Sequence, residues 1–546
     1  MKAKLIFASL FLSMAGLSAQ TYQVPVSEQD EPMMKGKFEP TWSSLENYQV
    51  PEWFRNVKFG IWAHWGPQCV EGSGDWMARS MYMEGTREYE YHVKHYGHPS
   101  EVGFKDIIPL WKAENWDPDK LVAFYKKIGA QYFFALGNHH DNMDLWDSKY
   151  QPWNSVNMGP KKDILAGWEK AARKYGLYFG VSLHADHAWS WYEPSQRHDT
   201  KGPKKGIPYD GKLTKADGKG KWWEGYDPQD LYAQNHPLSE NSWDNGMIHR
   251  QWAWGNGVCV PSQEYCTNFY NRTLDVINRY NPDLLYFDVT VAPFYPVSDA
   301  GLKIAAHFYN HNMATHKGKL EAVMFGKILD ENQRKALVWD VERGAPNKII
   351  DQPWQSCSCI GGWHYNTSIY EKNEYKSAAY VAKLLVDIVS KNGNLLLSVP
   401  LRADGTFDEK EEKILNEFGA WMNINKEAIY DTRPWVVFGE GPIADEDIPL
   451  NAQGFNEGSY SQAGAKEIRF TQTPKYLYAT VLAWPADGKV NIKSLAADNK
   501  LYEGKIRKVE LLGYGKVDFV RTAESLSVTL PTQPLNQIAP VLRIAK

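Results

Sequence analysis

The chain has 546 residues, with 61 lysines and arginines against 65 aspartates and glutamates, which gives a formal net charge of −4. Hydrophobic residues make up 43% and charged residues 23%, a composition typical of a folded globular protein that excludes a disordered or fibrous chain. A mildly acidic chain is a poor binder of polyanions, so we expect no nucleic-acid partner. The length allows one large catalytic domain and a smaller second one.

The N-terminus has the three parts of a secretory signal. Lys2 and Lys4 give a basic start, residues 5–12 are mainly apolar, and Ala19 ends a small-residue cleavage site before Gln20. We therefore predict a signal peptide over residues 1–19 and a secreted or periplasmic protein. No later stretch approaches the roughly 20 apolar residues that a membrane span needs, so we expect no membrane span.

Cysteines are few and odd in number. The five are Cys69, Cys259, Cys266, Cys357 and Cys359. This count disfavours a disulfide scaffold, although one bridge between Cys259 and Cys266 is compatible with an oxidising compartment. The Cys357-x-Cys359 pair lacks a second pair of ligands at zinc-site spacing, so we expect buried thiols and no metal.

From about residue 50 to 440, short apolar runs alternate with amphipathic helical patterns. Helices are predicted over residues 118–128, 164–175, 262–281 and 377–390, and strands over residues 58–62, 131–136, 177–183, 284–288, 336–342 and 394–399. This alternation favours the α/β class and a (β/α)8-type barrel domain over residues 20–440. No glycine-rich phosphate loop follows a strand, which disfavours a dinucleotide-binding fold.

Two segments depart from this alternation. Residues 190–262 form a polar stretch with a lysine cluster over residues 201–221, which we interpret as a solvated loop above the barrel mouth; contact with an anionic glycan is the alternative. Residues 441–546 carry only short strand patterns and predict an antiparallel β-sandwich that supports the barrel without contributing chemistry.

Polar residues that directly follow apolar strands are the candidates for chemistry, because a β/α barrel places its site at the carboxyl ends of the strands. Asp288 follows one such strand, with a helix cap as its alternative role, and His64 follows another. His139 and His140 follow a third; alternation along a strand predicts that one faces the ligand and the other packs behind it. Together they indicate a polyhydroxylated ligand, which the 23 Trp, 31 Tyr and 21 Phe also suit.

Several segments together resemble family 29 glycoside hydrolases, the retaining α-L-fucosidases, over roughly residues 40–440. The matching segments are residues 53–66, 138–155, 286–288, 342–344, 387–397 and 428–435. The resemblance implies a barrel followed by a sandwich, and a secreted, exo-acting enzyme without a cofactor. It implies the catalytic nucleophile at Asp288 and sugar-binding roles for His64, His139, His140, Trp76 and Arg343.

Three departures from the family pattern affect specificity and catalysis. Asp75 stands where the family often has glutamate, and Met143 where many members have phenylalanine; a roomier pocket would favour L-galactose, which is L-fucose with a hydroxyl added at C6. Gln355 follows Trp354 where many relatives carry the acid/base glutamate, and an amide cannot cycle a proton. We place Trp354 and Gln355 among the substrate-binding residues together with Asp75.

Glu342 is our first candidate for the acid/base, ahead of Glu321, Glu331 and Asp340; alternatively, it faces away from Arg343 and only anchors neighbouring structure. The leading hypothesis is a retaining exo-α-L-fucosidase. The alternatives are an α-L-galactosidase acting on L-galactose-containing glycans, including sulfated algal ones, a carbohydrate-binding protein without catalysis, and a metallohydrolase that uses His139 or His140. The oligomeric state stays open.

Overall fold

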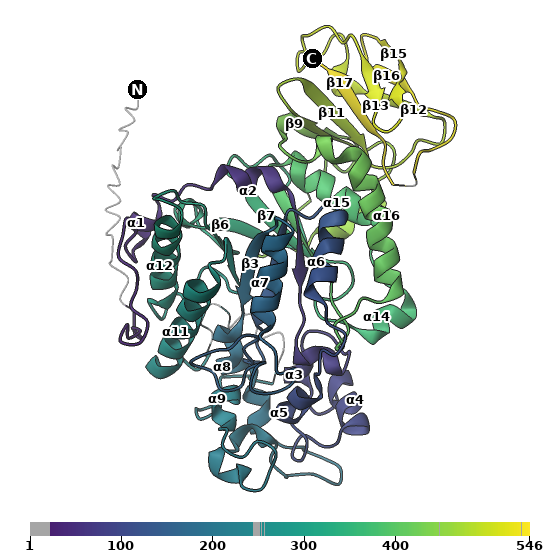
Figure 1. Ribbon diagram of the computed structural model, residues 1–546. Helices are drawn as coiled ribbons and strands as arrows, with labels where there is room; N and C mark the ends of the chain where they lie inside the picture. Colours follow the sequence, from purple (N-terminus) through teal and green to yellow (C-terminus); the bar gives the residue numbers. More distant parts are fainter. Residues whose placement is uncertain (1–21, 244–251, 253, 256, 447, 537) are drawn as a thin grey trace, which may run out of the picture.

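The computed structural model describes residues 22–243, 252, 254–255, 257–446, 448–536 and 538–546. The predicted signal peptide, residues 1–19, lies outside the described residues. Figure 1 shows a large body of helices and strands and, beside α16, a smaller strand-rich domain that contains the C-terminus.

Eight parallel strands form a closed barrel. Each strand pairs with the next one along the chain, and β8 pairs with β1 to close the ring. The strands are β1 (Phe59–Ala63), β2 (Tyr132–Asn138), β3 (Tyr178–Leu183), β4 (Leu284–Phe287), β5 (Val323–Gly326), β6 (Val338–Glu342), β7 (Trp354–Cys359) and β8 (Gly393–Ser398). This confirms the predicted barrel and adds β5 and β7, which the hydrophobic pattern did not reveal because β5 is short and β7 is rich in polar residues.

Side-chain caps fix where the predicted helices begin. The carboxylates of Asp117 and Asp163 accept hydrogen bonds from backbone N–H groups in the first turns of α6 and α7, and the Ser262 and Ser377 hydroxyls do the same for α11 and α15. The helices are α1 (Trp42–Leu45), α2 (Glu52–Val57), α3 (Met77–Ser80), α4 (Arg87–His95), α5 (Phe104–Ile107), α6 (Pro118–Lys127), α7 (Ile164–Lys174), α8 (Ala188–Trp191), α9 (Pro228–Tyr232), α11 (Gln263–Tyr280), α12 (Ala300–Thr315), α13 (Gln333–Ala336), α14 (Thr367–Lys372), α15 (Ala378–Ser390) and α16 (Glu409–Asn425).

The polar stretch predicted as a long loop lies between β3 and α11. It contains α8 and α9, which Figure 1 places with α3 and α5 at one end of the barrel body. Apart from the half-buried Lys204, the lysines of residues 201–221 are exposed to solvent. None of them lines the cavity described below, which agrees with the interpretation as a solvated loop.

The C-terminal region folds as two antiparallel sheets, which confirms the predicted sandwich. Its strands are β9 (Arg433–Glu440), β10 (Ile468–Gln472), β11 (Tyr476–Val481), β12 (Lys489–Ile492), β13 (Val509–Leu511), β14 (Gly515–Lys516), β15 (Asp518–Arg521), β16 (Leu526–Thr529) and β17 (Val541–Ala545). β9 precedes the predicted boundary at residue 441 but pairs with β10, so strand pairing in this region begins earlier than predicted. The indole N–H of Trp421, on α16, donates to the carbonyl of Ala539 at 2.9 Å and joins the two regions.

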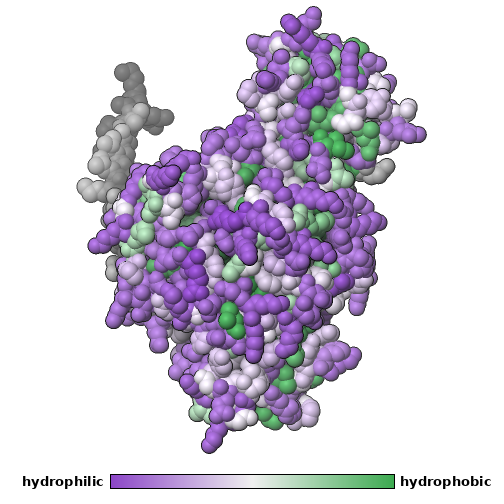
Figure 2. Space-filling view, in the orientation of Figure 1, coloured by the Kyte–Doolittle hydropathy of each residue, from purple (hydrophilic) through white to green (hydrophobic). Residues whose placement is uncertain are grey.

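Most of the surface in view is hydrophilic, with small hydrophobic patches that include one on the C-terminal domain (Figure 2). No helix among the described residues is long and apolar enough to cross a membrane. All five cysteines are free thiols, so the bridge between Cys259 and Cys266 that the sequence left open does not form in this structure.

Candidate active site

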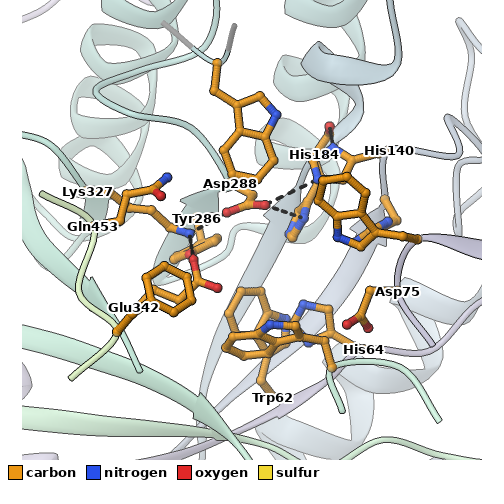
Figure 3. Close-up of a pocket in the computed structure, with 15 residues that line it drawn as sticks. Trp62, His64, Asp75, His140, His184, Tyr286, Asp288, Lys327, Glu342 and Gln453 are labelled. Atoms are coloured by element: carbon orange, nitrogen blue, oxygen red, sulfur yellow. Dashed lines mark hydrogen bonds and ion pairs between the residues drawn. The ribbon is translucent and has the colours of Figure 1, made fainter. Parts of the chain in front are cut away.

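A cavity at the carboxyl ends of the barrel strands collects polar side chains from several strand ends (Figure 3). His64 follows β1, His184 follows β3 and Asp288 follows β4, while Lys327 follows β5 and Glu342 is the last residue of β6. Each stands two residues after a strand residue, and because strand side chains alternate between faces, it keeps that residue's orientation. Trp62 and Tyr286, which precede His64 and Asp288 in this way, line the bottom of the same cavity.

Lys327 bridges two carboxylates. Its Nζ lies 2.5 Å from Asp288 Oδ1 and 2.6 Å from Glu342 Oε2, and its side chain is only 2% exposed (Figure 3). A buried ammonium between two acids offsets much of the cost of placing their charge away from water. The arrangement therefore holds both carboxyl groups at one point of the cavity.

The environment shifts the two carboxyl pKa values in opposite directions. Burial alone would raise the pKa of Asp288, but Lys327 and a hydrogen bond from His140 hold that pKa well below its ordinary value. Burial raises the pKa of Glu342, the charge of Asp288 adds to this, and Lys327 offsets only part of it. One carboxyl group is thus kept ionised and the other is favoured to keep its proton, which is the division of roles found in acid and nucleophile pairs.

Four histidines line the cavity together with Asp288: His64, His139, His140 and His184. His140 Nε2 lies 3.3 Å and His184 Nδ1 4.0 Å from Asp288 Oδ2. Burial lowers the pKa of His64, His139 and His184 well below the ordinary value, so these rings are neutral at physiological pH. Neutral imidazoles can both donate to and accept from hydroxyl groups.

His139 and His140 both line the cavity, contrary to the prediction that one would pack behind the other. β2 ends at Asn138, with a register shift against β3 between Leu136 and Asn138, so the alternation of a regular strand no longer applies to the two histidines. Their ring centroids lie 4.5 Å apart. His140 Nδ1 pairs with the carbonyl of His184 at 2.8 Å, and His139 Nδ1 with the side-chain amide of Gln68 at 2.7 Å.

The predicted pocket residues Asp75 and Trp76 also line the cavity. Asp75 Oδ1 accepts hydrogen bonds from the backbone N–H of His364 at 2.5 Å and pairs with the ring of that residue at 3.2 Å. Further aromatic walls come from Trp252, Trp363 and Phe455. The cavity thus combines polar groups at its centre with ring faces around them, which suits a sugar.

Arg343, Trp354 and Gln355 lie outside this cavity, which corrects their predicted place in it. Trp354 is fully buried, and its indole N–H donates to the carbonyl of Lys391 at 2.9 Å. Gln355 faces the barrel interior below the cavity, where it donates to Asp340 at 2.9 Å and accepts from Tyr132 at 3.1 Å. The amide therefore satisfies buried polar groups of the barrel core, and its inability to transfer protons does not concern the site.

The orientation of β6 decides between the acid/base candidates. Glu342 points into the cavity, and its neighbour Arg343 lines a second cavity instead. Asp340 shares the inward orientation of Glu342 but is buried deeper, where Gln355, Cys357 and Tyr286 contact it. Met143 is fully buried and does not line the cavity, so it is not a wall of the pocket as predicted, whereas Asp75 does line it.

Sequence reasoning missed several residues that line the cavity, among them His184, Lys327, Gln453 and Phe455. His184 directly follows a predicted strand and could have been found by the same strand-end argument as Asp288. Lys327 was missed because β5 was. Gln453 and Phe455 come from the connection between β9 and β10, which returns to the barrel and forms a parallel bridge between Gly454 and Glu342.

Among the described residues, His139, His140 and His184 form the one cluster whose ligand atoms could hold a metal ion, since these atoms lie within 4.8 Å of one another. Two of the three already use a ring nitrogen for a protein hydrogen bond. The expectation that the site works without a metal stays a prediction, tested below.

Comparisons with known proteins place the chain in a family. The family described as alpha-L-fucosidase matches residues 26–427, and the alpha-L-fucosidase C-terminal domain matches residues 462–545. The human plasma alpha-L-fucosidase is 24% identical over 524 residues, which cover 92% of this chain and 90% of that protein. The alpha-L-fucosidase of Dictyostelium discoideum is 24% identical over 415 residues, covering 73% and 76% respectively.

Solved structures show the same fold. The Thermotoga maritima alpha-fucosidase superposes with a TM-score of 0.65 at 25% identity and covers 93% of this chain and 100% of its own. Another alpha-L-fucosidase gives a TM-score of 0.66 at 23% identity with the same coverage. The family match extends over most of the chain and contains every strand of the barrel. The chain therefore belongs to the α-L-fucosidase family of glycoside hydrolases.

Proposed function

We propose that this glycoside hydrolase is a retaining, exo-acting α-L-fucosidase that releases terminal L-fucose from glycans. The main support is the pair of carboxyl groups, Asp288 and Glu342, that Lys327 joins. Asp288 Oδ1 lies 2.5 Å and Glu342 Oε2 lies 2.6 Å from Lys327 Nζ, so these two oxygens are at most 5.1 Å apart. Carboxyl groups of retaining glycosidases lie about 5–5.5 Å apart, whereas inverting enzymes need about 6.5–9.5 Å to seat a water.

In the first step the Asp288 carboxylate attacks the anomeric carbon while Glu342 gives its proton to the glycosidic oxygen. The bond from carbon to the leaving oxygen breaks and an ester to Asp288 forms. In the second step Glu342, now a carboxylate, takes a proton from water, the water oxygen attacks the same carbon, and Asp288 leaves. The product keeps the α configuration.

Lys327 contacts both partners of this exchange, which explains its position. Before the first step the negative charge resides on Asp288, and after it the charge resides on Glu342. Because Nζ lies 2.5 Å from one carboxylate and 2.6 Å from the other, the ammonium stabilises the charge at both ends of the transfer without moving. The neutral histidines can meanwhile hold the sugar hydroxyls.

The closed bottom of the cavity supports exo action on one terminal sugar. Trp62 and Tyr286 line it and are only 1% exposed, since they continue into the packed barrel interior. Aromatic walls suit the C6 methyl group of L-fucose, but an apolar pocket rejects an added hydroxyl only weakly, by about 100-fold at most. L-Galactose therefore remains the second candidate sugar.

A parallel assay decides between the sugars. The purified protein is incubated with aryl α-L-fucoside and aryl α-L-galactoside, and kcat/KM is measured for both. We expect faster release from the fucoside. Faster release from the galactoside would contradict the assignment of the sugar, and sugar binding without release from either would favour a carbohydrate-binding protein.

The opposite pKa shifts predict a bell-shaped dependence of kcat/KM on pH. Activity needs ionised Asp288, whose lowered pKa places the acid limb well below the ordinary range of a carboxylate. It also needs protonated Glu342, so activity falls as pH rises through the raised pKa of that group. With a fucosylated glycan, whose leaving group needs the proton, Glu342→Gln cannot titrate, so its residual activity should lack the alkaline limb. An alkaline limb that persists in this variant would assign it to another group.

Lys327→Met removes the bridging cation at similar volume. We expect kcat/KM to fall by about 10²- to 10³-fold, the size of effect seen when one preorganised electrostatic partner is lost. Because Lys327 lowers the pKa of Asp288, the acid limb should also move to higher pH. Lys327→Arg keeps the charge and is the matched control. A Lys327→Met enzyme that melts like wild type yet keeps both its rate and its acid limb would contradict the bridging role.

The absence of a metal requirement is tested by exhaustive treatment with a chelator. We expect kcat/KM on an aryl fucoside to stay unchanged, since the proton donor and the nucleophile are both carboxyl groups. Loss of activity that added zinc restores would instead assign a metal to His139, His140 and His184.

We also propose that the protein is exported after cleavage near Ala19, on the strength of the N-terminal sequence pattern alone. N-terminal sequencing of the protein isolated from its native cells tests this. A mature chain that begins at Gln20 is the expected result, and an intact N-terminus on a cytoplasmic protein would contradict it.

A further inference from the structure

A second cavity lies next to the catalytic one and shares a wall with it. Phe455 lines both cavities, with Gln453 on the catalytic side and Glu457 on the other. The second cavity also borders the residues that follow β7 and the start of α15, with Ile360, Lys376 and Ser377 among its lining. It therefore opens at the same end of the barrel as the catalytic cavity.

The shared wall is fastened directly to the acid/base. The Phe455 N–H donates to the Glu342 carbonyl at 2.7 Å, and the Glu342 N–H donates to the Gln453 carbonyl at 2.8 Å. A Cβ on Gly454 would lie 2.0 Å from the Glu342 carbonyl oxygen, so only glycine permits this approach. The wall therefore adjoins Glu342, the group that would give its proton to the leaving oxygen of the glycan.

Two residues of this junction have a positive φ angle, a backbone conformation that residues other than glycine rarely adopt. Arg343 has φ 49° and Phe455 has φ 66°. Such residues cost free energy and persist where the surrounding structure fixes them, often at binding sites. The Arg343 N–H donates to Cys357 at 2.7 Å and its carbonyl accepts from Glu457 at 2.9 Å, which fixes this conformation.

The second cavity carries a cation with free hydrogen-bonding capacity. Arg343 uses Nε to bind Glu457 at 2.8 Å, while its two terminal nitrogens make no hydrogen bond or ion pair with any residue that the structure describes. Its side chain is 41% exposed. A guanidinium with both terminal nitrogens free presents the planar fork that carboxylate and sulfate groups bind.

The other charges of the cavity leave this fork available. Lys376 lies 3.0 Å from Glu457 Oε1, and Ser358 donates to Glu457 Oε2 at 2.6 Å. The Glu457 carboxylate therefore pairs with two cations, Lys376 and Arg343. Glu374 is exposed at the rim, where water and salt screen its charge. The N-terminus of α15, which Ser377 caps, adds a partial positive charge on the same side.

We propose that this second cavity binds the leaving-group part of the glycan, with the Phe455 ring against the sugar next to fucose and Arg343 as the ligand of an anionic substituent on that chain. The substituent is a carboxylate or a sulfate ester. The proposal rests on the proposed fucosidase function and specifies the class of its substrate. The Phe455 segment lies between the two regions that match the family, residues 26–427 and 462–545.

The test compares α-L-fucosyl-galactose, α-L-fucosyl-galacturonate and a set of monosulfated α-L-fucosyl-galactoses of the same linkage, with an aryl α-L-fucoside assayed alongside. We expect the wild type to prefer at least one anionic substrate over the neutral one by roughly tenfold in kcat/KM, as one partly exposed charged hydrogen-bond pair allows. A preference for the galacturonate identifies a carboxylate, and a preference for a monosulfate identifies a sulfate ester. The preference should weaken with added salt.

Arg343→Gln should reduce this preference to near unity, and Arg343→Lys should retain part of it. Lys372→Gln is the matched control, because Lys372 is exposed on α14 and lines neither cavity. Equal kcat/KM for neutral and anionic substrates in the wild type, or an unchanged preference in a folded Arg343→Gln enzyme, would overturn this proposal. If the aryl fucoside is still cleaved in that case, the fucosidase function stands; failure to cleave it would refute the function itself.

Discussion

Asp288→Gly should lose at least about 10³-fold in kcat on an aryl α-L-fucoside, because no other described carboxylate can attack the anomeric carbon from the same point. Asp288 directly follows β4, and Lys327 and His140 hold it in place. Lys327 stays paired with Glu342 after the substitution, so no buried charge is left without a partner. We expect the variant to fold, with a melting temperature close to that of the wild type.

A small anion offers a stringent control for this substitution. The space left by the Asp288 carboxylate lies next to the Lys327 ammonium, which would attract azide. Azide should restore cleavage and give the β-L-fucosyl azide, since it attacks from the face that Asp288 vacated. Full activity of Asp288→Gly without azide, or an azide product of α configuration, would contradict the assignment of the nucleophile.

Glu342→Ala should separate substrates by their leaving groups. A glycan leaves as a poor alkoxide and needs the proton, so its kcat/KM should fall by about 10²- to 10⁴-fold, the range of general acid catalysis. An aryl fucoside with a stable phenolate should keep most of its kcat/KM. Its kcat should fall together with KM, because the ester to Asp288 accumulates when Glu342 no longer activates water.

Glu331→Ala provides the matched control for that experiment, since Glu331 is an exposed carboxylate that does not line the cavity. Its kinetics should equal those of the wild type on both substrates. If Glu342→Ala lowers the glycan and aryl rates by the same factor, the Glu342 side chain does not transfer the proton to the leaving group.

The barrel and the nucleophile could be predicted because their signals are local. The capped helices α6, α7, α11 and α15 each precede an apolar strand or follow one, and Asp288 directly follows such a strand. Glu342 could be proposed by the same argument, but its orientation away from Arg343 required the pairing of β6 with β7.

The parts that could not be predicted depend on weak or distant signals. β5 has four residues and ends in glycine, so its pattern did not reveal the strand that positions Lys327. β7 places Gln355 against Asp340 inside the barrel, where burial of polar residues conceals a strand from a hydrophobicity pattern. Phe455 reaches the site because the neighbouring Gly454 forms a β-bridge with Glu342. A local sequence pattern cannot predict a contact between segments so far apart in the sequence.

The anomeric configuration of the first product tests the central claim most directly. The wild-type protein is mixed with an aryl α-L-fucoside in an NMR tube, and the anomeric proton of the released fucose is followed before mutarotation. Two displacements through Asp288 predict that α-L-fucose appears first and the β anomer grows in later. Initial formation of β-L-fucose would show a single displacement by water and would contradict the roles of Asp288 and Glu342 derived from their bridge to Lys327.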